Sequence, residues 1–210
     1  IHIVDRYLGS VKALGVENDG EGLDYFIPEG VSIEDILPPD FGADYIALVL
    51  GANHYTKKIP FEKLQKIISD SAAKFVLIGG KEDSQLGNHL EDGNSKIFNA
   101  AGRTTLTESA VLLKHAEAVI TPDTGMMHIA AALKKKIISI WGNTVPEFGM
   151  YAYVMPAQEH MPVIIENKDL SCRPCSKIGF DKCPKGHFHC MEMLDTSEVV
   201  AEIGAKKRST

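Results

Sequence analysis

Short apolar runs alternate with helix-like segments from residue 45 onward, and this alternation constrains the fold more than any other feature of the sequence. The runs are continuously apolar, as strands buried on both faces of a sheet are. The segments between them carry apolar residues at helical spacing. Strands separated by helices form βαβ units, so the sequence predicts an α/β fold, a Rossmann-like doubly wound parallel sheet with helices on both faces. The expected strands are 45–50, 75–78, 96–98, 118–120, 137–141 and 163–165, and the expected helices are 61–69, 83–90, 106–115, 125–133 and 197–203.

The first 44 residues do not follow this alternation. A helix is expected over residues 5–14, ended by Gly15, and a short strand over residues 24–27. The segment 29–41 contains prolines and several acidic residues, as linkers often do. The expected divisions of the chain are the tail of an N-terminal domain with its linker at 1–44, and the Rossmann-like domain at 45–210, with a cysteine-rich loop at 172–190 and a C-terminal helix.

Composition and charge exclude several classes of protein. Apolar residues make up 44% of the 210 residues, enough for a buried core, and charged residues make up 24%. The formal net charge of −6 argues against a general nucleic-acid-binding surface. We expect no membrane-spanning helix, because no run approaches the necessary length, and the first residues do not resemble a secretory signal. All four cysteines lie after residue 171, which favours a reducing, cytoplasmic setting.

The segment after the expected strand 118–120 reads Thr-Pro-Asp-Thr-Gly and leads directly into a helix. It places an acid, Asp123, a hydroxyl, Thr124, and a flexible glycine, Gly125, at the helix N-terminus. Free backbone N–H groups and the positive end of the helix dipole make this an anion site, and a glycine lets a ligand approach the backbone closely. His128 lies one turn inside the helix and can reach back over the same mouth. The alternative is an ordinary strand-to-helix turn with Thr124 or Asp123 as its N-cap.

The expected strands all end in small and polar residues, and the carboxyl ends of parallel strands meet at one edge of the sheet, where ligands bind. Lys57 and Lys58 follow the first strand, where a lysine can reach a phosphate as a compact charge; the alternative is a solvated basic turn. Glu82 follows the second strand, where a carboxylate can accept hydrogen bonds from ribose hydroxyls. The alternative for Glu82 is an acid favoured by the dipole at a helix N-terminus.

Several stretches of the chain together resemble a known family. They are GANHYTKKIP at 51–60, IGGKED at 78–83, NAAGRT at 99–104 and TPDTGMMHIAAA at 121–132. The chain resembles glycosyltransferase family 9, the bacterial enzymes that add heptose from ADP-heptose to the lipopolysaccharide core. Residues 2–8 and the cysteine-rich stretch are also similar to members of this family, so the resemblance covers nearly the whole chain.

The resemblance implies a GT-B glycosyltransferase, in which two Rossmann-like domains face each other across a cleft and the second domain holds the nucleotide sugar. This chain would then be chiefly the C-terminal, donor-binding domain. The catalytic base would lie in the N-terminal domain, so the fragment alone is expected to be inactive. The implied donor is an ADP-sugar, with no required metal. The implied acceptor is a lipid-anchored glycan at the inner face of the inner membrane, with peripheral membrane contact.

The site roles of the family carry over to particular residues of this chain. Lys57 would neutralise phosphate charge, and Thr124 and Gly125 would hold the diphosphate. Asp123 and His128 would line the sugar–diphosphate region. The remaining implied contacts are those of Glu82 with the ribose and of Met126 or Met127 with the adenine.

The cysteines follow the spacing C-x2-C-x7-C-x6-C. A structural zinc could be held by these thiols, because the first pair has a spacing typical of zinc sites. The second pair is spaced too widely for a standard zinc ribbon or finger, and the alternative is a packed loop with reduced thiols or an adventitious disulfide. The four candidates are Cys172, Cys175, Cys183 and Cys190.

Two other functions are compatible with the same architecture. A GT-B-like sugar-nucleotide epimerase would also place a diphosphate on such a helix, but it needs a UDP pocket and acid–base pairs that the sequence does not identify. A non-catalytic nucleotide-sugar-binding module would keep the site and lack the transfer step.

Overall fold

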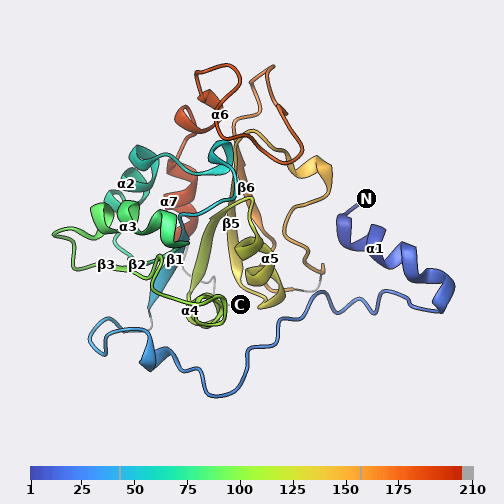
Figure 1. Cartoon of the computed structure of the whole chain (residues 1–210), viewed down its shortest axis with the longest axis horizontal. Helices are drawn as coiled ribbons and strands as arrows, with labels where there is room; N and C mark the ends of the chain where they lie inside the picture. Colours follow the sequence, from blue (N-terminus) through green and yellow to red (C-terminus); the bar gives the residue numbers. More distant parts are fainter. Residues whose placement is uncertain (43, 157, 205–210) are drawn as a thin grey trace.

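The computed structural model describes residues 1–42, 44–156 and 158–204. Its strands form one sheet in which every pairing is parallel, in the order β3-β2-β1-β4-β5-β6 (Figure 1). The strands are β1 (Tyr45–Val49), β2 (Lys74–Ile78), β3 (Ile97–Asn99), β4 (Ala118–Pro122), β5 (Lys136–Trp141) and β6 (Val163–Glu166). The strands expected from the sequence are therefore confirmed, with ends that differ by one or two residues.

The order of the strands reverses at β1. From β1 the chain moves outward through β2 to β3, and β4 then returns to the other side of β1 before the chain continues to β5 and β6. Ile46 accordingly pairs with Phe75 of β2 on one side and with Ala118 of β4 on the other. In doubly wound sheets, ligands bind beyond the carboxyl ends of the strands at such a point of reversal. The topology therefore predicts that a ligand binds at the loops that follow β1 and β4.

Helices cover both faces of the sheet (Figure 1). They are α2 (Phe61–Ser69), α3 (Ser84–Glu91), α4 (Leu106–His115), α5 (Gly125–Ala132), α6 (His189–Glu192) and α7 (Ser197–Gly204). Leu64 of α2, Leu90 of α3 and Val199 of α7 belong to the apolar cluster on one face. Leu112 of α4 and Met127 of α5 belong to the separate cluster on the other face, so the doubly wound arrangement is confirmed. Among the described residues, no helix has the length and apolar character needed to cross a membrane.

The first 44 residues add a helix and a surface segment to this core. The expected helix is present as α1 (Ile3–Val11), followed by a 3₁₀ turn, and it ends at Gly15, whose φ of 77° lies in the left-handed region that favours glycine. The expected strand over 24–27 is wrong, because these residues form no strand and Phe26 is 87% exposed. Figure 1 shows this segment crossing below the sheet, and none of the strand pairings in the described residues includes it.

Helix α1 is attached to the segment that follows β5. The imidazole Nε2 of His2 lies 2.8 Å from the carbonyl oxygen of Tyr151, and its ring centroid lies 4.7 Å from that of Tyr153. The hydroxyl of Tyr153 donates to Asp5 at 2.7 Å. These contacts bring the start of the chain to the side of the sheet on which α5 lies.

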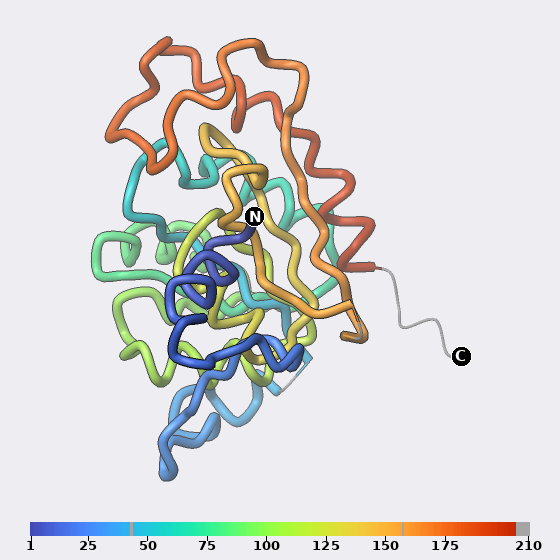
Figure 2. The backbone as a smooth tube through the Cα atoms, turned by 90° about the vertical axis from the view of Figure 1, so that its right-hand side faces the viewer, coloured from blue at the N-terminus to red at the C-terminus, as the bar shows by residue number. Residues whose placement is uncertain are grey.

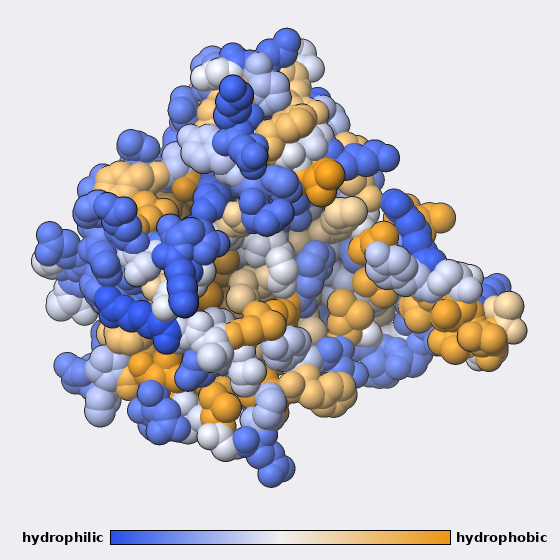
Figure 3. Space-filling view, in the orientation of Figure 1, coloured by the Kyte–Doolittle hydropathy of each residue, from blue (hydrophilic) through white to orange (hydrophobic). Residues whose placement is uncertain are grey.

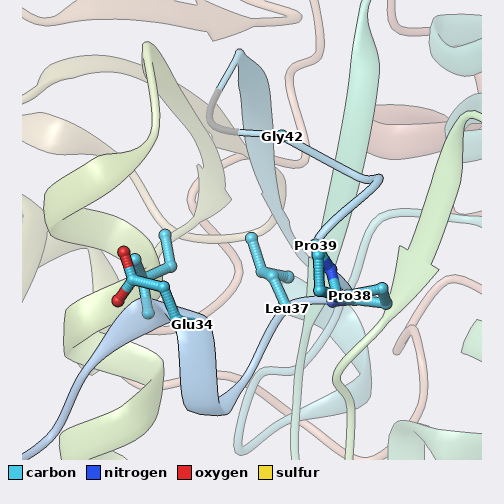
Figure 4. Close-up of a pocket in the computed structure, with 6 residues that line it drawn as sticks. Glu34, Leu37, Pro38, Pro39 and Gly42 are labelled. Atoms are coloured by element: carbon cyan, nitrogen blue, oxygen red, sulfur yellow. The ribbon is translucent and has the colours of Figure 1, made fainter.

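The segment 33–42 packs on the same face, beside α4. Leu37 and Phe41 join the apolar cluster that contains Leu112. A small apolar pocket of about 200 Å³ lies here, lined by Ile33, Glu34, Leu37, Pro38, Pro39 and Gly42 (Figure 4). Because Gly42 lies shortly before Tyr45, the first residue of β1, this pocket lies at the amino edge of the sheet. Figure 2 shows the segment at the end of the molecule opposite the cysteine-rich loop.

Candidate functional site

An ion pair crosses the point of strand reversal at the carboxyl edge of the sheet. Lys57 lies at the end of a 3₁₀ turn, η3 (Tyr55–Lys57), that follows β1, and Asp123 directly follows β4. The Nζ of Lys57 lies 2.7 Å from Oδ2 of Asp123, and the two side chains are only 12% and 7% exposed. The two loops singled out by the topology are therefore joined by opposite charges, which are shielded from solvent and so interact strongly.

The N-terminus of α5 opens beside this pair. Thr124 is the N-cap, and its hydroxyl accepts a hydrogen bond from the backbone N–H of Met126 at 3.0 Å. Gly125, the first helical residue, is exposed, and a Cβ built on it would meet no heavy atom within 4 Å. The other free N–H groups of the first turn thus face open space next to a lysine, which is the arrangement that binds anions. Of the two N-cap alternatives, the structure selects Thr124.

Thr144 is a member of the site that the sequence analysis did not single out. It follows β5, is buried, and donates a hydrogen bond from its hydroxyl to Oδ2 of Asp123 at 2.9 Å. The same carboxylate oxygen therefore receives Lys57 and Thr144 together. The polar character of the strand end was visible in the sequence, but only the pairing of β5 with β4 brings this hydroxyl to Asp123.

His128 lies one turn into α5, as expected, and is half-buried. Burial is the main cause that lowers the pKa of His128 below its ordinary value; the negative charge of Asp123 opposes this, and the positive charge of Lys57 acts in the same direction as burial. The imidazole is therefore neutral near pH 7 and offers one donor and one acceptor nitrogen. Both members of the ion pair influence this pKa, so His128 lies in their electrostatic field.

Lys58 makes a second ion pair at the neighbouring strand end. Its Nζ lies 2.7 Å from Oδ1 of Asp83, which is 2% exposed. The other oxygen of Asp83 accepts the backbone N–H of Gly80 at 3.0 Å. A Cβ on Gly51 would collide with the carboxylate of Asp83, so the acid is enclosed by the strand ends. This pair holds the loops after β1 and β2 together.

The structure places the other two expected contacts at the same edge but not within the ion-pair group. Glu82 lies in a 3₁₀ turn after β2; it is exposed and makes no hydrogen bond or ion pair with a described residue. Met126 is half-buried in the first turn of α5. Met127, the alternative to Met126, is fully buried in the apolar core.

The cysteine-rich loop covers the turn that carries Lys57. The hydroxyl and backbone N–H of Thr56 donate to the carbonyl of Phe180, and the N–H of Phe180 donates back to the Thr56 hydroxyl at 2.8 Å. The rings of Tyr55 and Phe188 lie 5.2 Å apart. Because the two residues that precede Lys57 in the turn are held in this way, the backbone that presents Lys57 has little freedom.

Arg173 connects the same loop to the end of β5. Its guanidinium is buried and forms an ion pair with Glu166 of β6 at 2.8 Å. It also donates to the backbone carbonyls of Gly142 and Thr144. A continuous set of buried polar contacts thus runs from β6 through Arg173 and Thr144 to Asp123.

The four cysteines are reduced. Burial is the main cause that raises the pKa of Cys175, and it raises the pKa of Cys190 to about 11, so these thiols are protonated at neutral pH. In the described part of the chain, no group of three or more His, Cys, Asp or Glu side chains is arranged to hold a metal ion. The expected zinc site therefore stays a prediction.

Comparison with known proteins identifies the family. The profile of glycosyltransferase family 9 (heptosyltransferase) matches residues 26–182. Lipooligosaccharide heptosyltransferase 2 of Campylobacter jejuni is 30% identical over 154 residues, which cover 71% of this chain and 45% of the relative. Lipopolysaccharide heptosyltransferase 1 of Pseudomonas aeruginosa is 30% identical over 169 residues, which cover 75% of this chain and 44% of the relative. The chain thus spans less than half the length of these curated relatives.

Solved structures support the fold. The family 9 glycosyltransferase of Veillonella parvula aligns with a TM-score of 0.65 at 18% identity, covering 95% of this chain and 58% of that one. Escherichia coli heptosyltransferase WaaC, solved with ADP, aligns with a TM-score of 0.57 at 24% identity, covering 78% of this chain and 50% of that one. Since the family profile covers most of the chain and the fold agrees, the chain belongs to glycosyltransferase family 9, the heptosyltransferases.

Proposed function

We propose that this chain is the donor-binding part of a glycosyltransferase that moves heptose from ADP-heptose to an acceptor in the lipopolysaccharide core. The observation that carries the proposal is the Lys57–Asp123 ion pair beside the open N-terminus of α5, at the point of strand reversal. The names of the curated relatives supply the sugar and the class of acceptor. Residues 1–44 would be the end of an N-terminal domain with its linker, and residues 45–210 the donor domain.

The diphosphate would bind at the mouth of α5. The hydroxyl of Thr124 and the backbone N–H of Gly125 would donate to phosphate oxygens, supported by the helix dipole. Lys57 would exchange part of its contact with Asp123 for the diphosphate. As the bond between the anomeric carbon and the phosphate oxygen breaks, ADP takes the electron pair, and Lys57 stabilises the growing negative charge. The acceptor hydroxyl attacks the anomeric carbon and gives its proton to a base.

The other contacts follow from position along the sheet edge. His128 and Asp123 would line the sugar side of the diphosphate. Glu82 lies two strands away from β4, where its exposed carboxylate would accept hydrogen bonds from the ribose hydroxyls. Met126 would contact the adenine, because Met127 is committed to the core. The general base would come from the part of its relatives that this chain does not span, so the chain alone would bind donor and transfer little or nothing.

The chemistry of this site requires no metal, because a lysine and a helix N-terminus supply the positive charge. A structural zinc on Cys172, Cys175, Cys183 and Cys190 is a separate proposal, and it would require the thiols to lose protons that burial now holds. Elemental analysis of protein prepared without chelator tests it: one zinc per chain, lost in Cys190→Ala, is expected. We place the enzyme in the cytoplasm at the inner face of the inner membrane, because the acceptor is lipid-anchored.

Isothermal titration with ADP, and with UDP as the comparison nucleotide, tests the donor site. We expect the wild type to bind ADP selectively, and Lys57→Ala and Asp123→Ala to weaken that binding. Lys96→Ala is the matched control, because Lys96 is exposed and adjoins the amino end of β3. Preference for UDP would favour an epimerase of similar architecture. If both substitutions leave ADP binding unchanged, the donor does not bind at the Lys57–Asp123 ion pair.

A further inference from the structure

The end of the cysteine-rich loop combines exposed apolar side chains with lysines. Ile178 is 67% exposed and Phe180 39%, and Tyr55 of the adjacent turn is 51% exposed. Lys177 and Lys182 flank Ile178 and Phe180 in the sequence, and Lys185 follows in the same loop. These six residues are called the loop tip below. Figure 3 shows apolar and strongly hydrophilic residues side by side over this end of the molecule.

The apolar residues of the loop tip are held outward by the backbone. The hydroxyl of Ser176 accepts the N–H groups of Ile178 and Gly179, each at 3.0 Å. Phe180 is fixed by its reciprocal hydrogen bonds with Thr56. The exposure of Ile178 and Phe180 is therefore a property of an ordered turn. Adjacent exposed apolar side chains on an ordered surface commonly mark a contact with another molecule or a membrane.

The charge of the loop tip is opposite to that of the chain. All three lysines are exposed, and none forms an ion pair or a hydrogen bond through its side chain with a described residue. One acid, Asp181, lies among them, beside His54. The whole chain carries a net charge of −6, so this end is a local positive region on an acidic protein. Lysines next to exposed aromatic and aliphatic side chains fit an anionic lipid surface, which attracts the former and takes up the latter.

The loop tip lies next to the proposed donor site. Phe180 is bonded to Thr56, and Thr56 directly precedes Lys57 of the ion pair. The loop tip and the mouth of α5 therefore lie at the same edge of the sheet. We propose that the loop tip docks on an anionic phospholipid membrane and so holds the donor site close to the lipid surface. The inference extends the proposed function, from which it takes only the lipid-anchored acceptor.

Co-sedimentation with vesicles tests the docking surface. The wild-type chain is expected to bind vesicles of phosphatidylglycerol and phosphatidylcholine, to bind pure phosphatidylcholine much more weakly, and to be released by salt. Because each lysine near an anionic surface contributes about five-fold in affinity, Lys177→Glu/Lys182→Glu/Lys185→Glu should reduce binding by about 100-fold. Ile178→Ser/Phe180→Ser should reduce it by about ten-fold.

Matched variants control for charge and for apolar area. Lys12→Glu/Lys96→Glu/Lys114→Glu makes the same change in net charge on exposed lysines elsewhere, and Leu14→Ser/Phe26→Ser replaces two apolar side chains that are more exposed than Ile178 and Phe180. Both should bind vesicles as the wild type does. Loop-tip variants that bind vesicles equally well, or a wild type that does not bind anionic vesicles, would overturn the proposal. So would a loop tip that instead joins two copies, detected as a dimer that the loop-tip variants dissociate.

ADP titration of the same proteins separates this inference from the proposed function. Loop-tip variants that keep wild-type ADP affinity are folded and retain their donor site, so their vesicle binding reports on the surface alone. A chain that binds vesicles but not ADP would support the membrane-docking proposal and contradict the proposed donor site.

Discussion

Two adjacent lysines, Lys57 and Lys58, make the same kind of contact in different surroundings. Each places its ammonium 2.7 Å from the carboxylate of a buried aspartate at the end of a neighbouring strand. Asp123, the partner of Lys57, lies at the open mouth of α5. Asp83, the partner of Lys58, is enclosed by the strand ends and also accepts the N–H of Gly80.

The difference would let one turn serve both the proposed binding of the donor and the stability of the fold. The Lys57 pair borders a helix N-terminus at which Gly125 leaves space for a ligand, so its charges are available for exchange with an anion. In the Lys58 pair, Asp83 is enclosed by the strand ends although Lys58 itself is 26% exposed, so we expect these charges to join two loops. We therefore expect substitution of Lys58 to lower mainly the free energy of unfolding, and substitution of Lys57 to lower mainly the affinity for ADP.

The largest effect is expected on stability, from Lys58→Met. The substitution leaves the carboxylate of Asp83 buried without its cation, and we expect the free energy of unfolding to fall by about 3 kcal/mol. Urea denaturation measures this, and Lys58→Arg should recover most of the loss. ADP affinity should remain within about two-fold of the wild type. A stable Lys58→Met protein that has lost ADP binding would reverse the roles of the two pairs.

Lys57→Met should instead act on binding. Loss of a charged contact to the diphosphate is expected to weaken ADP binding by about 30-fold, or about 2 kcal/mol. Its effect on unfolding should be smaller than that of Lys58→Met, because Asp123 borders the open mouth of α5, where water can approach it, whereas Asp83 is enclosed by the strand ends. Calorimetric titration and urea denaturation of both variants measure the contrast. Equal losses of stability with unchanged ADP affinity would mean that both pairs are structural.

A smaller effect is expected from Thr144→Val, which removes the second donor to Asp123 and preserves the shape of the side chain. We expect ADP affinity to fall by about five-fold, or about 1 kcal/mol, because Oδ2 of Asp123 is then positioned by Lys57 alone. Thr144→Ser retains the hydroxyl and should restore wild-type affinity. If Val and Ser weaken binding equally, packing at this position matters and the hydrogen bond to Asp123 does not.

The smallest effect concerns pH and His128. Burial lowers the pKa of His128 in the folded protein, so the unfolded chain takes up the proton first as the pH falls. The contribution of His128 to stability is therefore present above its ordinary pKa and is lost as the pH falls through the lower, folded value. Thermal unfolding between about pH 7.5 and about pH 5.5 should show a smaller decrease for His128→Gln than for the wild type. Identical decreases would indicate that other groups cause the acid sensitivity.

The N-terminal segment shows where sequence reasoning reached its limit. The helix before Gly15 could be predicted because its apolar spacing and its terminating glycine are local signals. The strand expected over 24–27 was wrong because a strand requires a partner, and this segment crosses below the sheet without one. The same limit applies to Thr144 and Arg173, whose partners lie 21 and 29 residues away along the chain.

The sequence by itself determined the order of strands and helices, both apolar faces of the sheet, and the Asp123–Gly125 helix start, since each depends on periodicity or on neighbouring residues. Only the tertiary structure decided that Lys57 pairs with Asp123 while Lys58 pairs with Asp83, and that Thr144 shares Oδ2 of Asp123 with Lys57. The physical reason is that these contacts join strand ends that are distant in sequence. Their distances are set by the order β2-β1-β4-β5 in the folded sheet.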